Sequence, residues 1–175
     1  SLMLLLARHC DELVPPDWPH WREAGLAVAV GLALWAVWLT LDEGLFVVGH
    51  PGSGFDPRRA DGSLVVPLAL VRWLGAALVV PVIEELFWRS FILRWLERPD
   101  FLAQAPGLVS GRAVLASSLA FGLEHSQWAA GLLAGLAYAW LYRRSGKLWV
   151  PILAHGVTNG VLGAWVLAQG QWQYW

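Results

Sequence analysis

Three charged side chains lie within six positions of one another in an otherwise apolar stretch of the sequence. Residues 64–96 are dominated by apolar side chains, and Glu84, Glu85 and Arg89 interrupt this run. A charged side chain at the centre of a bilayer costs roughly 2.5–3.5 kcal/mol on insertion scales, so such residues generally face partners or a wet cavity and mark function. We therefore expect these three residues to form part of a functional site.

Helical spacing separates the roles of the two glutamates. Residues four apart share a helix face, so Glu85 and Arg89 can pair and offset the cost of burying both charges. Glu84 points about 100° away from Glu85 and is free to face a different partner. A purely structural ion network of these three residues is the simpler alternative.

Two later segments supply polar groups that complete a possible catalytic site. His155 and Asn159 share one helix face, and Phe121 and His125 share another. A carboxylate beside a neutral imidazole can hold and deprotonate a water molecule. An imidazole N–H together with an asparagine amide can donate to the oxyanion of a tetrahedral intermediate. The combination fits hydrolysis of an amide bond inside the membrane.

Each of these groups also has a less specific interpretation. His125 lies at a helix end and could be an interfacial residue, and His155 with Asn159 could be a hydrogen-bonded pair between membrane helices. A further alternative is a zinc-dependent hydrolase, because a glutamate and two histidines (Glu84, His125 and His155) form a known type of zinc site. The sequence contains no His-Glu-x-x-His motif in support of zinc.

Composition identifies the class of protein. Of the 175 residues, 57% are hydrophobic and 14% are charged, against about 25% charged residues in a typical soluble domain. The net charge of −1 offers no basic surface for nucleic acid, so no nucleic-acid partner is expected. The single Cys10 excludes an internal disulfide. We predict an all-α, polytopic transmembrane helix bundle in contact with the lipid bilayer.

The apolar segments predict about five spans in one membrane-embedded domain that covers residues 1–175, with its motif core at 64–168. Because a span needs about 20 apolar residues in a helix, Ala24–Leu41 qualifies as a first full span, and the third segment is shorter. Pro67 and Pro81 are expected to kink the long second helix. The predicted helices are Ala24–Leu41, 64–97, Gly111–His125, Trp128–Arg143 and Leu148–Ala168.

Positive charge predicts the orientation in the membrane. If the spans alternate, Arg58 and Arg59 lie on one side, and the other side receives Arg8, Arg22, Arg94, Arg98, Arg112, Arg143, Arg144 and Lys147. Since cytoplasmic loops carry the excess of Lys and Arg, we expect the basic loops to be cytoplasmic and the C-terminus to lie outside. Helix lengths put the site roughly 10–20 Å below the cytoplasmic face, which suggests a cavity that opens to the cytoplasm.

The motifs together resemble the CPBP family of intramembrane glutamic endopeptidases, which includes CAAX proteases and bacteriocin-processing enzymes. The family pattern is Glu-Glu-x-x-x-Arg, then Phe-x-x-x-His, then His-x-x-x-Asn. In this sequence the matching residues are Glu84, Glu85, Arg89, Phe121, His125, His155 and Asn159. The resemblance is closest to the CAAX prenyl protease-related branch that accompanies exosortase systems in bacteria. The stretches 80–89, 121–125 and 131–138 carry this closer match.

The resemblance implies a role for each motif residue. Glu84 would act as the general base, with His125 orienting the water. His155 and Asn159 would form the oxyanion hole, and Glu85 and Arg89 would organise the site. No cofactor is implied.

The resemblance also suggests a setting. The substrate would be a peptide tail or a membrane-protein segment, the location the bacterial inner membrane, and an exosortase sorting system a possible associate. A non-catalytic membrane scaffold or immunity-type binding protein, using the same cavity to bind a partner, is the main alternative.

Overall fold

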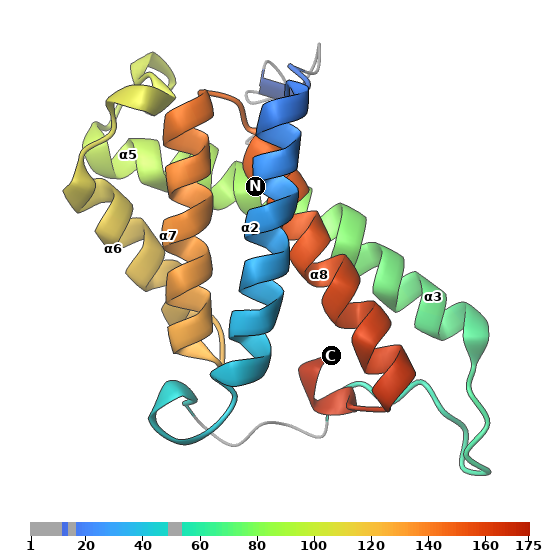
Figure 1. Cartoon of the computed structure of the whole chain (residues 1–175). Coiled ribbons are helices and arrows are strands. Elements are labelled where there is room, and N and C mark those ends of the chain that lie inside the picture. Colours follow the sequence, from blue (N-terminus) through green and yellow to red (C-terminus); the bar gives the residue numbers. More distant parts are fainter. Residues whose placement is uncertain (1–11, 14–16, 49–53) are drawn as a thin grey trace.

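The chain folds into an all-helical bundle, as the composition predicts (Figure 1). The computed structural model describes residues 12–13, 17–48 and 54–175. Cys10 lies outside these described residues. The long helices are α2 (Trp21–Thr40), α6 (Gly111–Leu123), α7 (Trp128–Ser145) and α8 (Trp149–Gln169), together with one continuous helical stretch from Val66 to Glu97. Each of the five predicted helices is present, with ends within a few residues of those expected.

The Val66–Glu97 stretch, called here the motif helix, changes its hydrogen-bonding pattern along its length. It consists of α3 (Val66–Leu74), the π-helical η2 (Gly75–Val79), α4 (Val80–Glu85), the π-helical η3 (Leu86–Leu93) and α5 (Arg94–Glu97). At 1.5 Å per residue it is about 48 Å long, which exceeds the roughly 30 Å hydrocarbon core. The wide turns of η2 come directly before Pro81, where a kink is expected.

Among the described residues, three helices are long and apolar enough to cross a membrane: α2, the motif helix and α8. Of the other two, α6 has only 13 residues, and α7 reaches 18 residues but is less apolar. Short 3-10 turns connect the long helices at Gly44–Phe46 (η1), Phe101–Ala103 (η4), Pro106–Leu108 (η5) and Trp172–Tyr174 (η6). The protein is therefore a multi-pass membrane protein in which α6 and α7 form a helical hairpin.

The bundle has two distinct ends. At the basic end, Lys147 in the α7–α8 loop binds Glu23 at the start of α2, with 3.2 Å between Nζ and Oε2. At the other end, called the C-terminal end, the backbone N–H of Val48 donates to Ser126 and that of Phe55 donates to Trp175. In Figure 1, α2 (blue) and α7 (orange) run side by side between these ends, and α8 (red) crosses toward the motif helix (green).

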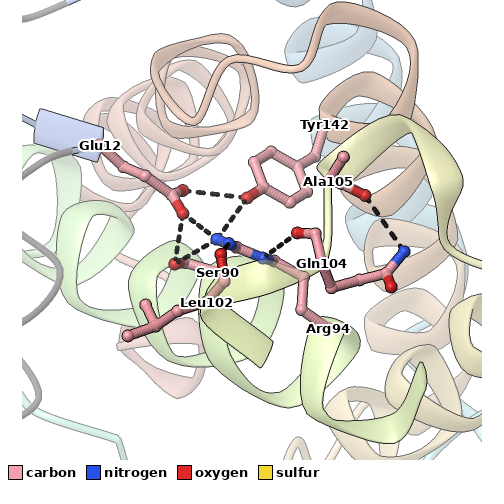
Figure 2. Close-up of polar contacts among 7 residues, drawn as sticks. All are labelled: Glu12, Ser90, Arg94, Leu102, Gln104, Ala105 and Tyr142. Atoms are coloured by element: carbon pink, nitrogen blue, oxygen red, sulfur yellow. Dashed lines mark hydrogen bonds and ion pairs between the residues drawn. The ribbon is translucent and has the colours of Figure 1, made fainter. Parts of the chain in front are cut away.

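A buried arginine near the basic end joins segments that are far apart in the sequence (Figure 2). Arg94 is 5% exposed and forms an ion pair with Glu12, whose carboxylate also accepts a hydrogen bond from the Tyr142 hydroxyl at 2.9 Å. The Nε of Arg94 donates to the Gln104 carbonyl at 2.8 Å. This cluster fixes the end of the motif helix against α7 and the segment that precedes α2.

The α6–α7 hairpin depends on glycine where the two helices come closest. A Cβ at Gly122 would lie 2.8 Å from the Trp128 carbonyl oxygen and 2.9 Å from the Leu132 nitrogen, and neither backbone atom can move without displacing α7. We expect Gly122→Ala to lower the free energy of unfolding by about 1–3 kcal/mol, the range for overpacking a well-packed interior. Thermal unfolding in detergent micelles measures this change.

Gly25→Ala is the matched control, because no atom lies within 4 Å of the position that a Cβ would occupy on this α2 residue. Its stability should stay within about 1 kcal/mol of wild type. Equal effects at the two glycines would show that helix propensity, rather than close packing of α6 on α7, decides the outcome.

Candidate functional site

A fully buried carboxylate lies at the centre of the predicted site. Glu85 is 0% exposed, and its Oε2 accepts a hydrogen bond from Nε of Arg89 at 2.9 Å. Its second oxygen, Oε1, accepts a hydrogen bond from Nδ1 of His155 at 2.9 Å. The predicted Glu85–Arg89 pair is present, and the same carboxylate also connects the motif helix to α8.

Aromatic rings surround the rest of the arginine. Arg89 is also 0% exposed, and its two terminal nitrogens have no hydrogen-bond partner among the described residues. Its Cζ lies 4.9 Å from the Phe121 ring centre and 5.9 Å from that of Tyr138, distances at which a ring face attracts a cation. The Tyr138 ring in turn stacks on His155, with 4.9 Å between ring centres. Glu85, Arg89, Tyr138 and His155 therefore form a closed ring of contacts.

Glu84 is not part of this network, which agrees with the different helix face that its spacing predicts. It is half-buried and forms no ion pair among the described residues, and its Oε2 is a buried atom without a hydrogen-bond partner. The side chain lines a cavity of about 340 Å³. The remaining residues around this cavity are Trp38, Arg72, Ala76, Val80, Phe121, His125, Ala134, Tyr138, His155, Thr158, Asn159, Leu162, Gly163, Tyr174 and Trp175.

The structure brings together four of the six predicted site residues in this cavity: Glu84, His125, His155 and Asn159. The other two, Glu85 and Arg89, do not line it and lie behind His155. The six residues thus divide into four that line the cavity and a buried pair, Glu85 and Arg89, whose carboxylate holds His155.

His125 is held in a defined orientation. Its Nδ1 donates to the Phe121 carbonyl at 2.8 Å, and the edge of the Trp38 ring meets it with 5.5 Å between ring centres. Because a carbonyl oxygen can only accept, Nδ1 carries the proton, and Nε2 of the neutral ring is a hydrogen-bond acceptor. Its bond to Phe121, four residues earlier, shows that the Phe-x-x-x-His spacing sets the tautomer. His125 therefore lines the cavity in an orientation that the Phe121 carbonyl fixes.

His155 and Asn159 share a face but do not bond to each other. His155 bonds to Glu85, and Nδ2 of Asn159 donates to the carbonyl of Ala76 at 3.0 Å. Each therefore connects α8 to the motif helix. An asparagine amide has two N–H groups, so one donor remains after the Ala76 bond.

The cavity lies on the opposite side of the site from the one that helix lengths suggest. Its lining includes Trp38 near the end of α2, Leu162 in the second half of α8, and Trp175 beyond α8, all toward the C-terminal end. The cavity therefore extends from the site toward the C-terminal end of the bundle, whereas helix lengths suggest the basic end. Counting residues from a helix end gives depth only, whereas the open side depends on where neighbouring side chains leave space.

Some residues at the site belong to none of the sequence motifs and were not predicted. Tyr138 stacks on His155 and donates from its hydroxyl to Thr158 at 2.9 Å, yet in sequence it is one aromatic residue among many on α7. Arg72, a further charged residue in the first part of the motif helix, also lines the cavity. Glu124, which precedes His125 in the sequence, is exposed and accepts a hydrogen bond from Nε1 of Trp88 at 3.2 Å.

Within the described residues, no group of three His, Cys, Asp or Glu side chains is arranged as a set of metal ligands. Glu84, His125 and His155, the set considered for zinc, face the same cavity without forming such a group. The Nδ1–H of His155 donates to the buried carboxylate of Glu85.

The fold and the site define a multi-pass helical membrane protein in which a buried Glu–Arg–His network supports a polar cavity. The family model described as Type II CAAX prenyl endopeptidase Rce1-like matches residues 66–161, a range that contains all six predicted site residues. The chain belongs to this Rce1-like family, as the motifs predict.

A curated relative matches about half of the chain. The Bacillus subtilis (strain 168) protein named "Putative membrane peptidase YdiL" is 34% identical over 98 residues, which cover 54% of this chain and 35% of the relative. The matched region thus spans about a third of that relative's length. No solved structure shows a significant match to the chain. These comparisons support a membrane protease, and the closer resemblance to an exosortase-associated branch stays a prediction.

The two adjacent glutamates should respond differently to the same substitution. Glu85→Gln leaves Arg89 buried without a counter-charge, and breaking a buried ion pair costs about 3–5 kcal/mol of unfolding free energy. Glu84→Gln breaks no ion pair, so we expect a change within about 1 kcal/mol. Thermal unfolding of both variants in the same detergent measures the difference. Equal destabilisation would contradict the division into a structural and a cavity-facing glutamate.

Proposed function

We propose that this protein is an intramembrane endopeptidase in which Glu84 acts as the general base on a metal-free water. The observation that carries the proposal is the meeting of Glu84, His125, His155 and Asn159 around one cavity while Glu84 has no ion-pair partner among the described residues. A carboxylate that supported only the fold would be paired, as Glu85 is. Membership of a peptidase family agrees with this assignment.

The tautomer of His125 favours activation of water. With Nδ1–H bound to Phe121, the neutral ring presents Nε2 as an acceptor. A water molecule that donates one proton to Nε2 and the other to the Glu84 carboxylate keeps its lone pairs free to attack a peptide carbonyl carbon. Glu84 takes the proton as the C–O bond forms and later delivers it to the leaving amine nitrogen as the C–N bond breaks.

The oxyanion formed by this attack needs donors on the opposite side of the carbonyl. Asn159 has one N–H group left after its bond to Ala76. His155 uses Nδ1–H toward Glu85, so it offers an Nε2–H only as an imidazolium. The Glu85 carboxylate stabilises that charge. With His155 protonated, the positive charges of Arg89 and His155 balance the negative charges of Glu84 and Glu85.

The size and setting of the cavity favour a short peptide segment as substrate. A volume of about 340 Å³ is at the low end of the range for ligand sites, roughly 300–1,000 Å³. We propose a C-terminal tail or a membrane-associated segment as the substrate, held at the bilayer by its own apolar part. Association with an exosortase sorting system would supply substrates of this kind.

The distribution of charge supports a location and orientation. Arg143 and Arg144 in the last turn of α7 and Lys147 in the loop after it lie at the basic end, whereas Arg58 and Arg59 lie in the segment before the motif helix. We propose that the basic end faces the cytoplasm of a bacterium and that Trp175 lies outside the inner membrane.

The central prediction concerns Glu84. Glu84→Gln should lower the rate of peptide cleavage by at least about 100-fold, because it removes the general base while keeping the side-chain shape. Mass spectrometry of membrane-peptide termini, from host cells that express wild type or variant at equal levels, measures cleavage and identifies the substrate.

Glu124→Gln is the matched control, since this exposed carboxylate directly after α6 does not line the cavity. It should leave the termini unchanged. Identical termini in cells with wild type and Glu84→Gln, together with binding of a partner by both, would instead support the scaffold or immunity-type alternative.

Removal of metal tests the zinc alternative. Since Glu84 and His125 can activate water without a metal ion, we expect the purified protein to keep its cleavage activity after chelation, with less than about 0.1 zinc per chain by elemental analysis. Loss of activity on chelation, followed by recovery when zinc is restored, would assign Glu84, His125 and His155 as ligands instead.

A further inference from the structure

Pro81 removes one backbone donor from the helix beside the cavity. In the π-helical η2 the N–H of Val80 bonds to the carbonyl of Gly75, five residues earlier. In the same register, residue 81 would bond to the carbonyl of Ala76. Residue 81 is a proline and has no N–H. The carbonyl of Ala76 therefore lacks its helical donor.

The same proline accounts for the wide turn. In an α-helix its ring would clash with the carbonyl four residues earlier, that of Ala77. The five-residue pairing of η2 moves this carbonyl away from the ring. The displaced Ala77 carbonyl points toward α8, where a Cβ on Gly156 would lie only 2.9 Å from its oxygen.

Asn159 supplies the missing donor from α8. Its Nδ2 lies 3.0 Å from the Ala76 oxygen, and both residues line the cavity. The two helices approach closely at this level, because Gly156 has no side chain to separate them and Nε1 of Trp73 donates to the carbonyl of Gly160 at 2.8 Å. The Asn159 amide is therefore fixed by the Ala76 carbonyl, which has no helical donor because residue 81 is proline.

We propose that Pro81 is a positioning residue for the proposed reaction: it exposes the Ala76 carbonyl, which orients the Asn159 amide so that its second N–H faces the oxyanion. This inference rests on the function proposed above. With another residue at position 81, the segment can return to α-helical pairing. The N–H of Val80 then bonds to the carbonyl of Ala76 and the new N–H bonds to that of Ala77. The Asn159 amide then shares the Ala76 oxygen with a helical donor, which weakens the contact that orients it.

Nuclear magnetic resonance tests the geometry without any activity. Asn159 is the only asparagine in the sequence, so labelling with ¹⁵N-asparagine gives a single side-chain NH₂ group. In wild type we expect two well-separated amide proton signals, one of which exchanges slowly with solvent. In Pro81→Ala the two signals should move together and exchange at similar rates.

Pro67→Ala is the control, because Pro67 lies in the first turn of α3, where a backbone N–H has no helical acceptor to bond. It should leave the Asn159 signals unchanged. An unchanged spectrum in folded Pro81→Ala would overturn the proposal. So would wild-type signals that already behave as a free amide, and this measurement does not depend on whether Pro81→Ala folds.

Kinetics test the consequence, using a peptide identified from the new termini. Removal of an oxyanion donor lowers kcat by about 100- to 1,000-fold, so Asn159→Ala should fall in this range. Pro81→Ala should lower kcat at least tenfold with little change in KM, and should cause no further loss when combined with Asn159→Ala. Independent, multiplicative losses would show that Pro81 acts by another route.

The two measurements separate the two proposals. If wild type cleaves nothing but the resonance result is as expected, the endopeptidase assignment fails while the Pro81–Asn159 geometry holds. If wild type cleaves and Asn159 does not respond to Pro81→Ala, the positioning proposal alone fails.

Discussion

The arrangement of the site depends on one carboxylate that is completely removed from solvent. Glu85 accepts a hydrogen bond from Arg89 through one oxygen and from His155 through the other. An ionised group at this depth is tolerated only with compensating charges and hydrogen bonds. Glu85 therefore requires both partners, and in satisfying them it fixes the motif helix against α8. His155, which lines the cavity, is therefore held by a hydrogen bond to Glu85 that also stabilises the fold.

The aromatic residues around Arg89 stabilise the buried positive charge of its guanidinium. A guanidinium has five N–H donors, and only Nε of Arg89 bonds to Glu85. The faces of Phe121 and Tyr138 lie near the remainder of the group and provide favourable electrostatics without water. Because Tyr138 also stacks on His155, the packing that accommodates the buried cation restricts the imidazole as well. Stability and site geometry therefore depend on the same side chains.

The motif helix shows how irregular backbone can be used inside a membrane. Backbone polar groups in a bilayer must find partners within the protein, and those that proline leaves unpaired can be satisfied by side chains of neighbouring helices. At Ala76 this partner is Asn159, a motif residue. The backbone carbonyl that has no helical donor beside the cavity is thus the one that binds the amide of Asn159, a candidate catalytic residue.

The sequence by itself determined the local features of this protein. Apolar runs with polar breaks specify five helices to within a few residues, because helical hydrogen bonds and apolar length are local properties. The spacing of Glu85 and Arg89 specifies their ion pair, since residues four apart lie on one helix face. The three short motifs also identify the family, whose model matches residues 66–161.

Only the tertiary structure decided which partners the site residues take. His155 bonds to Glu85, 70 positions earlier, and Asn159 bonds to Ala76, 83 positions earlier. Such pairs depend on how closely helices approach, which is set by glycines such as Gly156 and by the wide turn before Pro81. The side on which the cavity lies was likewise decided by packing. Helical periodicity gives the direction of a side chain around its own axis, but it contains no information about which neighbouring helix that side chain meets.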